Sequence, residues 1–318
     1  MDTVLEIKNL GMSYETTEGS VSAVDNVSFR IMNGEAMGLV GESGCGKTSL
    51  GMCIMKLLPE NAKITNGEII FDGEDIVPKT EDEMRMIRWK GVSMIFQAAM
   101  NALNPVYKVG DQIIEAIVAH ENIIKEEARE KVRELYKLVG LSPERMENYP
   151  HEYSGGMRQR AIIAMALACD PKFIIADEPT TALDVIVQDE IIDEIKNIQK
   201  KLNMIMMYIS HDISVIAETC DKIGVMYAGN FIEYADTFAL FDNPLHPYTK
   251  ALMSSFPSIE GPKKELKPVP GEPPNLLNPP RGCRFYPRCS YAEEICRNER
   301  PEFVESEKGH FLACHLVI

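Results

Sequence analysis

The sequence predicts an α/β core with an antiparallel β subdomain, an α-helical subdomain and a small Cys-rich C-terminal extension. Two observations lead to this prediction. Residues 41–48 read GESGCGKT and fit the phosphate-loop pattern GxxxxGKT. Around them, apolar runs of strand length alternate with helical patterns, which is typical of a parallel sheet covered by helices. We therefore expect a P-loop NTPase core.

The loop at residues 41–48 has the flanks that a phosphate site needs. The apolar run 36–40 precedes it as a buried strand, and residues 49–52 begin a helix. Glycines let successive backbone N–H groups point at phosphate oxygens, and the helix N-terminus adds partial positive charge. Lys47 can reach the β- and γ-phosphates, while the Thr48 hydroxyl can ligate Mg²⁺. The expected nucleotide-binding set here is Gly41, Ser43, Gly44, Cys45, Gly46, Lys47, Thr48 and Ser49.

The N-terminal segments predict the antiparallel β subdomain. Residues 4–10 and 24–31 alternate apolar and polar positions, and residues 66–73 form a strand that enters a turn. Tyr14 lies between the first two strands, where its ring can stack on a purine base or pack as a strand residue. Residues 81–90 carry charge with helical spacing.

A helical insert follows the short apolar strand 92–96, which ends at Gln97. Residues 109–120 and 125–140 show helical periodicity and few β-branched clusters. We therefore expect an α-helical subdomain over approximately residues 98–157.

Residues 154–176 predict a helix followed by a strand of the α/β core. Ser154, Gly155 and Gly156 begin an apolar helix that runs to Cys169, and serine is a favourable N-cap residue. The continuous apolar run 173–176 predicts a central parallel strand.

Three further segments complete the core. We expect an amphipathic helix at 184–202, a buried strand at 204–209 that ends before His211, and a pair of strands at 222–228 and 230–235.

The composition changes near residue 257. Residues 257–280 are rich in proline, which predicts an extended linker. The last 36 residues hold four of the eight cysteines. We therefore divide the chain into a nucleotide-binding domain at 1–256 and a linker with a Cys-rich extension at 257–318.

The whole-chain composition narrows the class of protein. The chain has 318 residues, 45% of them apolar, and a net charge of −15, which argues against a general nucleic-acid binder. No apolar run approaches the ~18–20 residues that span a bilayer. The N-terminus also lacks the basic and apolar regions of a signal peptide. We expect a cytoplasmic protein that can dock on a membrane protein.

Asp177 and Glu178 follow the apolar run 173–176 and suit two roles in phosphoryl transfer. A P-loop enzyme needs a carboxylate in the Mg²⁺ shell and a group that orients the attacking water. Adjacent strand residues point in opposite directions. We therefore expect Asp177 to act on Mg²⁺ and Glu178 to act on water.

Taken in order, these motifs resemble those of an ATP-binding cassette ATPase, which implies ATP as the nucleotide. The matching residues are Tyr14 for adenine stacking, Gly41 to Thr48 for the Walker A loop, Gln97 for the Q-loop, Ser154-Gly155-Gly156 for the signature, Asp177 and Glu178 for the Walker B pair, Ala182-Leu183-Asp184 for the D-loop and His211 for the switch histidine.

The resemblance implies how these residues act. Two cassettes enclose two ATP molecules, and the P-loop of one faces the signature motif of the other. Thr48, Gln97 and Asp177 surround Mg²⁺, Glu178 polarises the attacking water, and His211 contacts the γ-phosphate region. Gln97 also links the site to the helical insert and so to a permease.

The likeness narrows to the oligopeptide and dipeptide transporter ATPases. The motifs that carry it are Leu103-Asn104-Pro105-Val106, residues 153–160, His246-Pro247-Tyr248-Thr249, residues 270–274, and residues 282–289. Ala98-Ala99 depart from the group, which commonly has an acidic residue after the glutamine, and this leaves the permease contact open.

This likeness implies the ATP-hydrolysing subunit of a di- or oligopeptide importer, peripheral to the cytoplasmic face of the membrane. Its implied partners are a second ATPase subunit, two transmembrane permease subunits and, indirectly, an extracytoplasmic substrate-binding protein, without nucleic acid. Relatives of the group carry nickel or oligosaccharides, so the solute stays open. The alternative from another class is a soluble cassette protein of translation or DNA repair.

Four cysteines in the last segment suggest a metal site, because a cytosolic cluster of thiols favours metal over disulfides. Their spacing, C-x₅-C-x₆-C-x₁₇-C, lacks the C-x₂₋₄-C pair usual for zinc and fits a 4Fe–4S cluster better. The resemblance also favours the cluster, while Zn²⁺ and two disulfides stay open as alternatives. The expected ligands are Cys283, Cys289, Cys296 and Cys314.

Charged residues surround these cysteines. We expect Arg284, Arg288 and Arg297 to favour the thiolate forms electrostatically, and His310 and His315 to lie on the surface.

Overall fold

The structure, a computed structural model, describes residues 3–97, 102–181, 183–254 and 269–317. The chain divides into two compact units, which are described separately. The first unit holds Met32–Glu35 and Pro78–Tyr208, and the second holds Thr3–Ile31, Ala36–Val77 and Ile209–Ile318. The domain boundary expected near residue 256 stays a prediction.

The first unit contains the strands β6 (Val92–Ile95), β7 (Phe173–Asp177) and β8 (Ile205–Ile209), in the order β8-β7-β6. β6 pairs in parallel with β7. Every residue of the three strands is buried, as expected of parallel strands covered on both faces. The apolar runs in the sequence predicted these strands because burial on both faces leaves no room for alternation.

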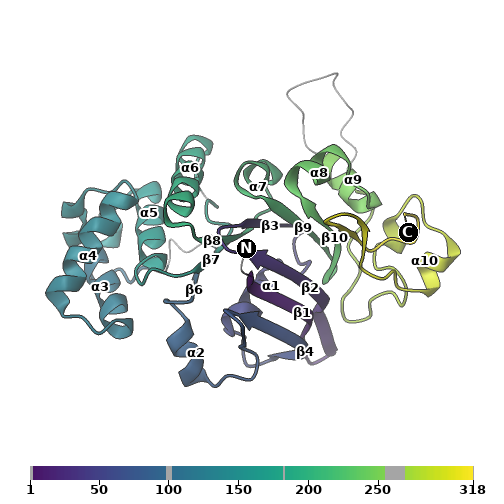
Figure 1. The fold of residues 1–318 in the computed structure, drawn as a ribbon, viewed down its shortest axis with the longest axis horizontal. Coiled ribbons are helices and arrows are strands. Elements are labelled where there is room, and N and C mark those ends of the chain that lie inside the picture. The colour runs from purple at the N-terminus through teal and green to yellow at the C-terminus, as the bar shows by residue number, and fades with distance from the viewer. Residues whose placement is uncertain (1–2, 98–101, 182, 255–268, 318) are drawn as a thin grey trace. The chain divides into compact units, whose positions relative to one another are not determined.

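The helices of the first unit are α2 (Glu81–Ile87), α3 (Val109–His120), α4 (Lys125–Leu138), α5 (Gly155–Ala166) and α6 (Val185–Leu202). Figure 1 shows α3, α4 and α5 side by side. In α4 the buried residues are Ala128, Val132, Leu135 and Tyr136, which is the helical spacing that predicted this helix. α5 ends three residues before the predicted limit at Cys169.

The second unit contains a four-stranded sheet in the order β2-β1-β4-β5. Its strands are β1 (Thr3–Thr16), β2 (Gly19–Met32), β4 (Ala62–Phe71) and β5 (Glu74–Asp75), and β1 pairs antiparallel with β4. A register shift between Lys8 and Gly11, next to Asn9 with φ 48°, lets β1 continue past the predicted end at residue 10. Tyr14 therefore lies inside a strand and not between two strands, which corrects the prediction.

Five further strands of this unit are neighbours within one sheet, in the order β11-β12-β10-β9-β3. The strands are β3 (Ala36–Val40), β9 (Lys222–Tyr227), β10 (Asn230–Asp236), β11 (Val304–Glu307) and β12 (His310–Leu312). The helices are α1 (Lys47–Met55), α7 (Ile213–Thr219), α8 (Thr237–Asp242), α9 (Pro247–Ser254) and α10 (Glu294–Asn298). β3, the strand that leads into the phosphate loop, runs parallel to β9.

The C-terminal strands extend this sheet. β12 pairs antiparallel with β10, and β11 pairs with β12 (Figure 1). His310 on β12 is buried and lies 2.8 Å from the fully buried carboxylate of Glu233 on β10, which corrects its expected surface position. The cysteine-rich segment is therefore packed into the second unit, and a separate extension beyond the core is not supported.

Candidate functional site

The phosphate loop connects the fully buried strand β3 to helix α1 in the second unit. Gly41 has φ 149° and Gly46 has φ 105°, and a Cβ atom at either position would lie 2.2 Å from a backbone oxygen, of Met226 or Ala23. Only glycine fits there. Gly44, with φ 77°, faces open space, so its backbone is accessible to a phosphate group. The loop therefore excludes side chains at Gly41 and Gly46 and leaves the backbone at Gly44 open.

Lys47 is folded back over the loop. Its Nζ donates to the carbonyl oxygens of Gly41, at 2.7 Å, and Glu42, at 3.1 Å, and the residue is buried. Cys45 is buried beneath the loop, whereas Ser43 and Thr48 are exposed. The cationic side chain thus lies where it can exchange carbonyl contacts for phosphate oxygens.

Tyr14 lies close to the same helix. Its hydroxyl is 3.0 Å from Oγ of Ser49, the third residue of α1, and its ring is partly exposed. The bond joins β1 to the start of the P-loop helix. The predicted stacking of this ring on a purine base stays a prediction.

The first unit holds the other predicted nucleotide residues. Asp177 is the last residue of β7 and is 1% exposed. Glu178 lies beyond the strand with φ 47°, so a left-handed backbone, and not strand alternation, gives it a direction different from that of Asp177. Gln97 donates to its Oε2 at 2.8 Å, and Thr181 donates to the same oxygen at 3.0 Å. The structure therefore brings Gln97 and Glu178 together, and their roles toward Mg²⁺ and water stay predictions.

The signature residues begin α5. Ser154 is the N-cap, and its Oγ accepts from the backbone N–H of Met157 at 3.3 Å, which confirms the predicted cap. A Cβ at Gly156 would lie 2.8 Å from Val187 of α6, so the close helix packing favours glycine. Ser154 is exposed, which leaves this helix N-terminus open to an anion from another molecule.

His211 is exposed in the second unit, between β8 and the Asp212 N-cap of α7. In the D-loop, Asp184 caps α6, whereas Ala182 lies outside the described residues. Ala98 and Ala99 also lie outside them, so their expected effect on permease contact stays a prediction.

The four C-terminal thiols line one small cavity, whose volume of about 10 Å³ is near that needed for a single water. Within the described residues, no group of three or more His, Cys, Asp or Glu side chains is placed to hold a metal ion. The donor set is chemically suitable for iron or zinc, but the predicted metal site is not supported by this arrangement.

Two of the three arginines that were expected to favour thiolates pair with carboxylates instead. Burial raises the pKa of Cys283 to about 11, and it raises the pKa values of Cys289 and Cys314 as well. Arg284 pairs with Asp25, and Arg288 pairs with Glu42. These two guanidinium groups therefore pair with carboxylates, which corrects the prediction for Arg284 and Arg288, and the role of Arg297 stays a prediction.

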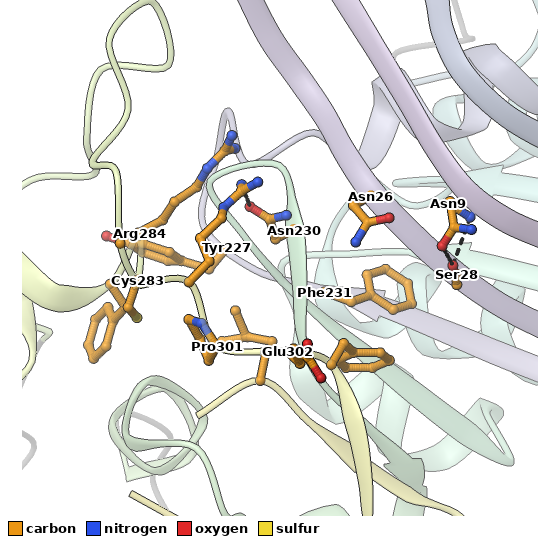
Figure 2. A pocket seen from close by; sticks show the side chains of 16 residues that line it. Asn9, Asn26, Ser28, Tyr227, Asn230, Phe231, Cys283, Arg284, Pro301 and Glu302 are labelled. Atoms are coloured by element: carbon orange, nitrogen blue, oxygen red, sulfur yellow. Dashed lines mark hydrogen bonds between the residues drawn. The ribbon is translucent and has the colours of Figure 1, made fainter. Parts of the chain in front are cut away.

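A cavity of about 430 Å³ lies elsewhere in the second unit. Figure 2 shows Asn9 and Asn26 on one side of it and Cys283 and Arg284 on the other. Arg284 is buried and donates to Asp25 and to a backbone carbonyl. Of the predicted site residues that the structure describes, Cys283 alone lines this cavity, so it is distinct from the phosphate loop.

The sequence did not indicate two residues that contact the phosphate loop. Arg288 binds the carboxylate of Glu42, and the hydroxyl of Tyr248 accepts from the backbone N–H of Glu42. Tyr248 lies in the recognised HPYT stretch, but nothing in the sequence paired Arg288 with a residue 246 positions away.

None of the helices in the described part of the chain is both long and apolar enough to cross a membrane. Two family models match the sequence. The model for "ABC transporter" matches residues 24–181, and that for "Oligopeptide/dipeptide transporter, C-terminal region" matches residues 232–296.

Curated relatives match along nearly the whole chain. A dipeptide transport ATP-binding protein of Caldanaerobacter subterraneus is 42% identical over 99% of this chain and 98% of its own length. An oligopeptide transport ATP-binding protein of Bacillus subtilis is 45% identical over 99% of this chain and 89% of its own length.

Solved structures show the same fold. A bacterial ABC transporter cassette, solved as a dimer, has a TM-score of 0.66 and 28% identity, covering 73% of this chain and 98% of its own. The CbiO1 cassette of Clostridium perfringens has a TM-score of 0.64 and 25% identity, covering 76% of this chain and 92% of its own. With relatives above 40% identity over nearly its full length, the chain belongs to the ABC transporter family of ATP-binding proteins.

Proposed function

We propose that this chain is the ATP-hydrolysing subunit of an importer of di- or oligopeptides. The observation that supports this most strongly is the full-length similarity to proteins named for dipeptide and oligopeptide transport, together with the match of residues 232–296 to the C-terminal region of such transporters. The proposed partners are a second ATPase subunit, two membrane permease subunits and, indirectly, a substrate-binding protein outside the membrane. The proposed location is the cytoplasmic face of that membrane.

The proposed site forms between two cassettes. One chain binds the triphosphate of ATP with residues 41–49 and stacks adenine on Tyr14, and the partner presents its signature residues 154–156. Charge stabilisation around all the γ-oxygens is what phosphoryl transfer requires. A similar solved cassette, described as a dimer in a post-hydrolysis state with ADP and Pi, supports this arrangement.

The proposed catalytic roles follow from the first-unit contacts. Glu178 accepts a hydrogen bond from the attacking water, and Gln97, which donates to Glu178, fixes the carboxylate. His211 contacts the γ-phosphate region. Thr48, Gln97 and Asp177 would hold Mg²⁺, which would supply charge neutralisation at the phosphates.

Two alternatives remain, one for the transported solute and one for the class of protein. Nickel or an oligosaccharide is the alternative cargo, and a soluble ATPase of translation or DNA repair is the alternative class. The match of residues 232–296 to a peptide-transporter model favours peptide cargo and a membrane permease.

Uptake by cells tests this function. In cells that carry the whole transporter, Lys47→Ala is expected to lower uptake of a labelled dipeptide to background, because the phosphate loop loses its cation. The control is Lys201→Ala, an exposed position in the last turn of α6, which should transport normally. Unchanged dipeptide uptake in the Lys47 variant, or loss of nickel uptake alone, contradicts the peptide assignment.

We further propose that Cys283, Cys289, Cys296 and Cys314 bind a 4Fe–4S cluster, with Zn²⁺ as the alternative. The wide spacing of the four cysteines in the sequence is the observation that supports this proposal. The role proposed for the metal is structural, and no hydrolytic step involves it.

Iron analysis tests the cluster. Anaerobically purified protein is expected to be brown and to contain about four irons per chain, and Cys296→Ser should remove both colour and iron. Cys53→Ser, at a buried cysteine of α1, is the control that should keep both. A colourless wild-type preparation with zinc rejects the cluster in favour of the alternative.

A further inference from the structure

Arg288 clamps the side chain of Glu42, the second residue of the phosphate loop. Its two terminal nitrogens lie 2.7 Å and 2.9 Å from the two carboxylate oxygens, which is a bidentate pair. The Arg288 side chain is 5% exposed and that of Glu42 is 26% exposed. Water is therefore largely excluded from this ion pair. Exclusion of water strengthens the attraction between the two charges.

The rest of Arg288 is fixed by several further contacts. Its Nε donates to the carbonyl of Pro270 at 2.7 Å, and its guanidinium lies over the ring of Tyr227, 5.7 Å from the centroid. A guanidinium held on several sides loses little freedom when it pairs with a carboxylate. Arg288 therefore acts on Glu42 as a rigid group.

Tyr248 holds the backbone of the same loop residue. The N–H of Glu42 donates to the Tyr248 hydroxyl at 3.0 Å, and the Tyr248 ring packs against Tyr227 and Phe285. His246 supports this position, since burial lowers its pKa to about 3 and its neutral Nδ1 accepts from the N–H of Tyr248. Two residues of the HPYT stretch, His246 and Tyr248, thus help to hold the backbone of the phosphate loop in place.

A carboxylate in this loop poses an electrostatic problem. ATP carries several negative charges, and a free Glu42 carboxylate one residue after Gly41 would repel them. Pairing with Arg288 neutralises that charge and turns the side chain toward the C-terminal segment. The Lys47 contact with the Glu42 carbonyl shows that the same residue also shapes the phosphate-binding backbone.

We propose that Arg288 and Tyr248 are positioning residues for ATP binding, and that Arg288 acts by neutralising and fixing Glu42. The C-terminal segment is then a built-in support of the phosphate loop. This inference rests on the proposed role of residues 41–49 in binding ATP. It adds residues outside the recognised motifs to the determinants of ATP affinity.

Equilibrium binding of a fluorescent ATP analogue to the full-length isolated chain tests the inference. We expect Arg288→Met to weaken binding about tenfold, as expected for loss of a charge-assisted pair near the ligand. The matched control is Arg284→Met, because Arg284 is equally buried in the same segment but pairs with Asp25. It should bind ATP within about twofold of the wild type, a factor worth under half a kcal/mol.

A second substitution separates electrostatics from folding. Adding Glu42→Gln to Arg288→Met removes the unpaired carboxylate and should restore most of the lost affinity, which a purely structural role of Arg288 does not predict. Tyr248→Phe should weaken binding without such rescue. Failure of rescue, or equal losses in the Arg284 and Arg288 variants, overturns the inference. Failure of the wild type to bind the analogue rejects the proposed function instead.

Discussion

The Glu178→Gln variant is expected to bind ATP and to release phosphate at least about a hundredfold more slowly than the wild type. The amide cannot accept the proton of the attacking water. It keeps the size of the side chain and can still bond Gln97 and Thr181, which hold the carboxylate. Phosphate release by the assembled transporter measures the loss, and binding of an ATP analogue measures the retained affinity.

A carboxylate on the next helix provides the control for this variant. Glu190 is exposed on α6 in the same unit and lies 3.7 Å from Arg160. Glu190→Gln should therefore hydrolyse ATP at the wild-type rate, since exposed ion pairs contribute little. Near-normal turnover in the Glu178 variant would remove this residue from the catalytic role.

Gly155→Asp is expected to abolish ATP-driven dimerisation while ATP binding to the isolated monomer stays within about twofold, a factor of under half a kcal/mol. An aspartate in the first turn suits the helix dipole, so α5 should stay folded. In the proposed dimer it places a negative charge against the γ-phosphate of the ATP bound by the other chain. Light scattering with and without ATP, in the Glu178→Gln background, measures the dimer.

Substitution of the cap residue Ser154 is expected to affect dimerisation less than Gly155→Asp does. Ser154→Ala removes the cap of α5 and is expected to cost about 1 kcal/mol of stability without introducing charge. It should weaken dimerisation less than Gly155→Asp. A large loss of ATP affinity in the Gly155→Asp monomer would mean that the signature serves the nucleotide of its own chain.

Local patterns in the sequence predicted much of the fold. The helix at 109–120 has the predicted bounds, and the strand after residue 172 is buried throughout, because periodicity and apolar runs report burial directly. The Ser154 cap was predicted from residue type alone. The signature, D-loop and switch residues were identified by the resemblance of the ordered motifs to a known family, and their roles stay predictions.

Long-range pairings could not be predicted in this way. The strand β12 is short, and its place beside β10 depends on partners more than 70 residues away. The left-handed backbone of Glu178 arises from the turn after β7. It could not be predicted, because glutamate is not a residue type that favours this conformation. The pairing of Arg288 with Glu42 spans 246 positions, so the sequence alone wrongly assigned Arg288 to the thiols.

Phosphate release by the wild-type chain, reconstituted in proteoliposomes with its permease and substrate-binding protein, tests the central claim most directly. We expect release to require Mg²⁺ and ATP, to rise when a dipeptide is added on the binding-protein side, and to vanish with Lys47→Ala. Release that does not respond to peptide, or that responds only to nickel or an oligosaccharide, would contradict the claim that this ATPase powers peptide import.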